Sequence, residues 1–184
     1  AFDEAQVRAG AVADDMMPDD IAVLLAFLKA QTASQHFAAA QPTTSSAYVI
    51  GADQILVCEG QIISKPASIE AAKDQLLWLA GKPHKLFSAI VLLRDGQRIW
   101  HHLAESALTM RQFDAAFADA YIQHIGDAAL CSPGSYQIES VTLLKRSKGN
   151  SCLKLKPLFM RWFSKFYRYL QCLQALPFKH GMDF

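Results

Sequence analysis

The stretch from Tyr48 to Pro66, YVIGADQILVCEGQIISKP, constrains the fold more than any other part of the chain. It contains two short apolar runs separated by Gly-Ala-Asp-Gln, and β-branched runs of this length next to glycine are typical of buried strands. Glu59-Gly60 predicts a tight turn into a returning strand, which ends before Pro66 because proline has no N–H for the ladder. The sequence therefore predicts a β-hairpin within a core.

An aspartate lies inside the first of these strands. Burying the carboxylate of Asp53 costs free energy unless it is paired or bound to a cation. Gly51 and Ala52 are small enough to let a ligand approach the backbone, and Lys65 could add positive charge from the neighbouring strand. Two interpretations follow: Asp53 is a catalytic or binding carboxylate, or it caps a bend while Lys65 is a solvated strand end.

The segment before the hairpin predicts a core-facing helix. Pro18 and two acids form a favourable first turn, because proline fits the first helical position and the macrodipole favours negative charge there. Apolar side chains then recur at helical spacing, at Ile21, Leu24, Leu25 and Leu28. Lys29 lies beside this stripe, and from the residues alone it is a surface lysine with a buried stem.

The segments after the hairpin alternate between helix and strand. The patterns predict a helix over 69–80, capped by Ser68, a strand over 87–93, and a hairpin turn at Asp95-Gly96. A strand over 98–100 and a helix capped by Asp114 and running through His124 follow. This alternation, with hairpins included, predicts an α/β fold with a mixed β-sheet flanked by helices.

Cysteine use and the known nucleotide motifs exclude several classes of protein. The four cysteines show no CxxC pairing or zinc-ligand spacing, which favours free thiols in a cytoplasmic protein. The polar N-terminus has no apolar core of a signal peptide, and no run of apolar residues is long enough to span a membrane. The chain contains neither a P-loop nor a GxGxxG fingerprint, so nothing favours a kinase or a dehydrogenase. No nucleic-acid partner is expected.

Charge divides the chain into two parts. Residues 1–140 carry 9 basic and 16 acidic side chains, whereas residues 141–184 carry 9 basic side chains and one acid. Within residues 151–184, basic side chains follow one another at helical spacing among aromatic residues, a pattern typical of a basic amphipathic helix. We expect this tail to dock on the chain or to fold poorly, and we do not expect it to contact a membrane.

The order and spacing of several short motifs identify a family. VIGADQ is followed by a hairpin and SKP, then by LAGKPH and the strand FSAIVLL. This series resembles the Maf family of nucleoside triphosphate pyrophosphatases, also described as septum formation inhibitor proteins. The resemblance implies two lobes around a cleft, as in Maf and ITPase-like folds. It makes residues 1–150 the Maf-like domain, N-terminally incomplete, and residues 151–184 a divergent basic, aromatic tail.

The resemblance also implies a reaction and a site. Water cleaves the bond between the α- and β-phosphates of a canonical or modified nucleoside triphosphate, giving a nucleoside monophosphate and pyrophosphate. Asp53 would be the proton acceptor, and Lys29, Lys65, Gln54 and Glu4 would contact the substrate. Asp53 and Glu4 would hold a divalent cation, and oxygen ligands of this kind suit Mg²⁺ or Mn²⁺.

One departure from the family pattern leaves alternatives open. Family members have a Ser-x-Ser-x-x-Arg loop near the N-terminus that helps hold the phosphates, and these 184 residues contain no such segment. The chain is then an enzyme that acts without this loop, an inactive fragment, or a non-enzymatic division-control protein that uses its basic tail for interaction. A homodimer is also left open.

Overall fold

A four-stranded sheet forms the centre of the computed structural model, which describes residues 2–40 and 47–137. The described residues belong to one unit, Ala1–Lys145. The strands lie in the order β2-β1-β3-β4, and every neighbouring pair is antiparallel. Their bounds are β1, Tyr48–Cys58; β2, Gln61–Ile63; β3, Pro83–Arg94; and β4, Gln97–Thr109. The predicted basic tail and the C-terminal end of the predicted domain lie outside the described residues.

Both predicted hairpins are confirmed. The β1–β2 turn has Glu59 and Gly60 at φ values of 51° and 77°, and the β3–β4 turn has Asp95 and Gly96 at 52° and 78°. Two successive residues with positive φ match the twist of antiparallel strands, which is why glycine follows an acid at each turn. The predicted α/β fold is confirmed. The sheet was expected to be mixed, whereas every strand pair within the described residues is antiparallel.

Strand β4 is longer than the segment 98–100 that was predicted from the sequence. It lies at the edge of the sheet and pairs with β3 along its whole length. Its first six side chains are all exposed, and they include polar residues and Trp100. An edge strand of this kind lacks the alternation of apolar and polar residues that marks a half-buried strand, so the pattern did not reveal its length.

The described part of the chain contains four α-helices. Their bounds are α1, Glu4–Ala13; α2, Pro18–Ala40; α3, Ile69–Leu79; and α4, Ala115–Ile125. The side chains of Ser68 and Asp114 cap α3 and α4 by accepting backbone N–H groups, as predicted. Helix α1 was not predicted, because Ala11 is its one fully buried residue and its apolar periodicity is weak. None of the described helices, including the 23 residues of α2, is long and apolar enough to cross a membrane.

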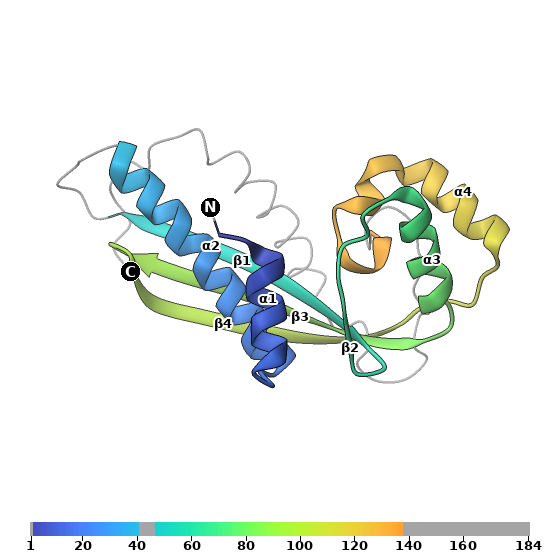
Figure 1. Ribbon diagram of the computed structural model, residues 1–184, viewed down its shortest axis with the longest axis horizontal. Coiled ribbons are helices and arrows are strands. Elements are labelled where there is room, and N and C mark those ends of the chain that lie inside the picture. Colours follow the sequence, from blue (N-terminus) through green and yellow to red (C-terminus); the bar gives the residue numbers. More distant parts are fainter. Residues whose placement is uncertain (1, 41–46, 138–184) are drawn as a thin grey trace, which may run out of the picture. The chain divides into compact units, whose positions relative to one another are not determined.

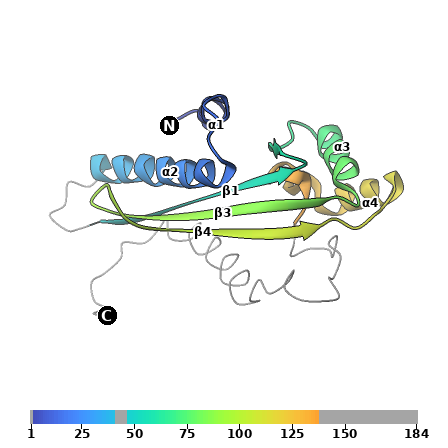
Figure 2. The ribbon, with the colours of Figure 1, turned by 90° about the horizontal axis from the view of Figure 1, so that it is seen from below.

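The described residues form two hydrophobic cores, one at each end of the long strands (Figures 1 and 2). In the first core, Ile21 and Leu25 of α2 pack with Ile55 of β1. In the second core, α3 and α4 pack against residues that include Leu56. Ile55 and Leu56 are consecutive but belong to different cores, because successive side chains of a strand point to opposite faces. This arrangement agrees with the two-lobed fold that was expected.

Helix α2 lies directly against β1 at Gly51. A Cβ atom on Gly51 would lie 2.1 Å from the carbonyl oxygen of Ala26 and 2.7 Å from the Cβ of Ala30, both on α2. Glycine therefore lets the backbone of the strand and the helix approach each other more closely than any larger residue would permit. This contact is next to Lys29 on the helix and two residues before Asp53 on the strand.

Candidate active site

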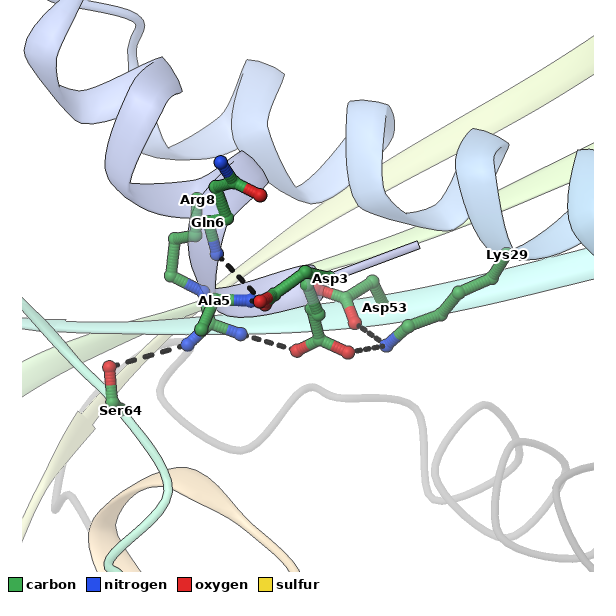
Figure 3. A network of polar contacts seen from close by, with 8 residues as sticks. Asp3, Ala5, Gln6, Arg8, Lys29, Asp53 and Ser64 are labelled. Carbon is green, nitrogen blue, oxygen red and sulfur yellow. Dashed lines mark hydrogen bonds and ion pairs between the residues drawn. The ribbon is translucent and has the colours of Figure 1, made fainter. Parts of the chain in front are cut away.

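Three charged side chains from three different elements meet beside the contact between α2 and Gly51 of β1 (Figure 3). The ammonium group of Lys29, on α2, donates to Oδ1 of Asp53 on β1. The same nitrogen lies 2.9 Å from Oε2 of Glu4, in the first turn of α1. Asp3 fixes the start of α1 by accepting the backbone N–H groups of Ala5 and Gln6. Glu4 is thereby held beside Lys29.

Asp53 is the most deeply buried member of this charged cluster. Its side chain is 6% exposed, compared with 33% for Lys29 and 30% for Glu4. Its second oxygen, Oδ2, is buried and has no hydrogen-bond partner among the described residues. A buried carboxylate oxygen without a partner is costly, so this atom needs a proton, a water molecule or a cation. The alternative that Asp53 caps a bend is wrong, because it lies within a continuous strand.

Burial and neighbouring charges shift the pKa values of all three groups. Burial raises the pKa of Asp53 above its ordinary value, even though Lys29 acts in the opposite direction. For Lys29, burial alone would lower the pKa, but Asp53 and Glu4 together outweigh it and the pKa is raised. For Glu4, burial would raise the pKa, yet the nearby cations outweigh it and the pKa is lowered. Asp53 is therefore the carboxylate that is more easily protonated.

Arg8 is a fourth member of the site, and the sequence analysis did not identify it. Its guanidinium contacts Oε1 of Glu4 through Nη2 and donates from Nη1 to Oγ of Ser64, at 3.3 Å. The Arg8 side chain is 15% exposed, although it lies on a helix with little buried surface. Glutamate and arginine four residues apart lie on the same face of a helix, and this spacing was the available sequence signal.

The two other predicted site residues are placed differently. Lys65 is exposed and follows Ser64, and its charge contributes to the lowered pKa of Glu4, so it acts on the cluster from nearby. Gln54 does not join the cluster: its side-chain amide donates to Oγ of Ser88 on β3, at 2.8 Å. Since Gln54 and Asp53 are consecutive in a strand, their side chains point to opposite faces.

The described residues offer a divalent cation two carboxylates, Asp53 and Glu4. No group of three or more His, Cys, Asp or Glu side chains that could hold a metal ion occurs within residues 2–40 and 47–137. Mg²⁺ is commonly bound through one or two carboxylates, with water and substrate phosphates as the remaining ligands. A cation bound in this way, or a water molecule, would satisfy the buried Oδ2 of Asp53, which has no partner among the described residues.

Together, the fold and this site define an α/β protein with a buried aspartate that is held by a lysine, and the same lysine pairs with a second carboxylate. The sequence profile of the family described as Maf-like protein matches residues 1–152, and the chain belongs to this family. It is 43% identical over 141 residues to a nucleoside triphosphate pyrophosphatase of Paramagnetospirillum magneticum, covering 77% of this chain and 69% of that protein.

Two other relatives carry related names. A 7-methyl-GTP pyrophosphatase of Brucella abortus is 42% identical over 138 residues, covering 75% of this chain and 66% of that protein. A nucleoside triphosphate pyrophosphatase of Caulobacter vibrioides is 41% identical over 150 residues, covering 80% of this chain and 71% of that protein. The chain thus spans about two thirds of the length of these relatives. The family predicted from the short motifs is confirmed.

Proposed function

We propose that this chain hydrolyses nucleoside triphosphates between the α- and β-phosphates and releases a nucleoside monophosphate and pyrophosphate. One observation carries the proposal: in a chain of the Maf family, Asp53 is buried, one of its oxygens is held by Lys29, and the other has no partner among the described residues. A carboxylate oriented in this way can accept a proton from an attacking water molecule.

In this proposal each oxygen of Asp53 has a separate role. Oδ1 is fixed by Lys29, whose charge favours the ionised carboxylate and so opposes the effect of burial on its pKa. Oδ2 is the atom that would take the proton from water as the new P–O bond forms. The electron pair of the broken bond leaves with pyrophosphate, so the bond between the two phosphates is exchanged for a bond to the water oxygen.

Lys29 and Lys65 provide the positive charge that a triphosphate needs. An ammonium group has three N–H donors, and Glu4 and Asp53 use two of those of Lys29. The third donor can reach a phosphate oxygen, and the exposed Lys65 adds a second cation. We propose that Asp53 and Glu4 hold Mg²⁺ or Mn²⁺ when substrate is bound. The cation would supply further positive charge to stabilise the developing charge on the phosphates.

The nucleobase of the substrate is a separate part of the proposal. Relatives are named for nucleoside triphosphates in general and for 7-methyl-GTP, so canonical and modified nucleotides are both candidate substrates. Gln54 lies on the other face of β1, fixed by Ser88. That Gln54 contacts the substrate stays a prediction, and from this face we do not expect it to take part in the proton transfer at Asp53. Cytoplasmic location and homodimer formation stay predictions.

Pyrophosphate release tests the proposal directly. The full chain would be assayed with canonical nucleoside triphosphates and 7-methyl-GTP, with Mg²⁺, with Mn²⁺ and with a chelator. Asp53→Asn should reduce turnover by roughly 10²- to 10⁴-fold, the usual contribution of a general base. Asp119→Asn is a matched control, since Asp119 is an exposed residue of α4 paired with Lys73. A well-folded chain that releases no pyrophosphate from any of these substrates would contradict the proposed function.

A further inference from the structure

Ser64, the residue before Lys65, is held from two sides. Its side-chain oxygen accepts a hydrogen bond from Nη1 of Arg8, at 3.3 Å. Its backbone carbonyl accepts one from the side-chain amide of Gln75, at 2.8 Å. Arg8 belongs to α1 and Gln75 to α3, so the two donors approach Ser64 from separate helices. Figure 3 shows the contact with Arg8 and its continuation toward Lys29 and Asp53.

Both donors are themselves fixed by other contacts. On one side, Arg8 is partly buried and bonded to Glu4, which in turn contacts Lys29. On the other side, Oε1 of Gln75 accepts from the backbone N–H of Gly134 and from the hydroxyl of Ser135, both at 3.2 Å. Ser135 is fully buried, so this end is anchored in the interior. The contacts therefore connect the Asp53 cluster with the turn at 133–135.

The segment that these contacts hold has little regular structure. Strand β2 is three residues long and ends at Ile63, and residues 64–66 lie outside regular structure. Pro66 is buried, but Ser64 and Lys65 are both exposed, so packing holds the proline and not the side chains of the two residues before it. Hydrogen bonds to the side chain and to the carbonyl of Ser64 restrain the adjacent peptide, and hence the point from which the Lys65 side chain extends.

We propose that Arg8, Ser64 and Gln75 form a clamp that positions Lys65 for the phosphates of the substrate next to the Asp53 carboxylate. These three are positioning residues that act through Lys65. The clamp rests on the proposed function for its effect on turnover. Its effect on the structure of residues 61–66 does not depend on that function. The two can therefore be tested separately.

The kinetic test uses the smallest change. Ser64→Ala removes the hydroxyl that Arg8 contacts and leaves the backbone carbonyl in place. We expect kcat/KM for pyrophosphate release to fall about 10-fold, as for other residues that orient a contact residue, and Ser64→Thr to restore most of it. Ser34→Ala, a half-buried serine on α2, is the control and should leave kcat/KM unchanged.

The same substitutions made in a Lys65→Met variant distinguish a positioning role from a general structural effect. In Lys65→Met, adding Ser64→Ala should change kcat/KM by less than about twofold, because the side chain that the clamp positions is already absent. An equal loss in both backgrounds would overturn the proposal, since Ser64 would then act on something other than Lys65. Arg8→Met should likewise lose less in the Lys65→Met background than in the wild type. Arg94→Met, at an exposed hairpin end, is its control.

Hydrogen exchange tests the clamp without any substrate. In Ser64→Ala and in Arg8→Met, the amides of residues 61–65 should exchange faster than in the wild type, whereas those of residues 97–109 should not. Unchanged exchange at 61–65 would overturn the clamp even if the enzyme is active. Faster exchange in a chain that releases no pyrophosphate would contradict the proposed function and leave the structural clamp in place.

Discussion

Lys29 and Asp53 are 24 positions apart in the sequence, and their side chains form an ion pair between α2 and β1. The lysine is shared with Glu4, so one cation links two carboxylates. Gly51 makes this possible because α2 could not lie so close to β1 if any side chain stood there.

Removing the charge of Asp53 should not destabilise the fold. Burial raises the pKa of this carboxyl, so at neutral pH its ionised form is less favourable in the folded than in the unfolded chain. Asp53→Asn should therefore leave the free energy of unfolding unchanged or raise it by about 1 kcal/mol or less. Thermal and urea unfolding would measure this. A large loss of stability would indicate that Asp53 has a structural role.

Removing Lys29 should have the opposite effect. Lys29→Met leaves the buried Asp53 carboxylate without its cation, next to a second carboxylate. We expect a loss of about 1–3 kcal/mol, below the value for a fully buried pair because the lysine is partly exposed. The double variant with Asp53→Asn should recover part of the loss. Lys85→Met, in the exposed pair with Glu105, should change stability by less than about 0.5 kcal/mol.

The Glu4 carboxylate should contribute a pH-dependent stability. Its pKa is lowered in the folded chain, so its contribution is fully present above the pKa of an unfolded glutamate, about 4.3, and is lost as the pH falls through the lower folded value. At pH 7 the wild type should be more stable than Glu4→Gln, and this difference should shrink below about pH 4. Urea unfolding at several pH values measures it. A difference that grows on acidification would show that the pKa of Glu4 is not lowered in the folded chain.

Acidification should reduce the activity at a pH above the pKa of an ordinary aspartate. Asp53 must be ionised to accept a proton, and its pKa is raised by burial. The acid limb of kcat/KM should therefore lie above about pH 3.9. Circular dichroism at each pH would confirm that the chain is still folded over this range. A limb below that value would assign the proton acceptor to another group.

Gly51→Ala should separate the strand from the helix. The added Cβ would meet the backbone of α2 at Ala26 and Ala30, and neither atom can move aside as a flexible side chain would. We expect a loss of about 1–3 kcal/mol in unfolding free energy and a fall in activity, because Lys29 moves with the helix.

Gly10→Ala is the matched control. Its Cβ meets nothing within 4 Å, so this change within α1 should be neutral or stabilising. An equal loss in both variants would contradict the close contact.

The sequence by itself determined the elements that depend on local chemistry. Ser68 and Asp114 marked helix starts through their caps, the acid-glycine pairs marked both hairpins, and the apolar runs marked β1. It also drew attention to Asp53, because a carboxylate within an apolar strand is costly wherever that strand is buried. Each of these signals depends on residues that are close together in the sequence, so the elements that they predict are the same in the folded chain.

Tertiary structure decided which charges meet. Arg8 contacts Ser64 only because α1 packs against the rest of the chain, and the few buried residues of α1 gave no sequence signal for that packing. From the residues alone Lys29 was expected to be a surface lysine. It lies at the centre of the cluster because Gly51 lets α2 pack close to β1. Packing between distant segments sets such contacts, and no pattern along the chain encodes the distance between two side chains.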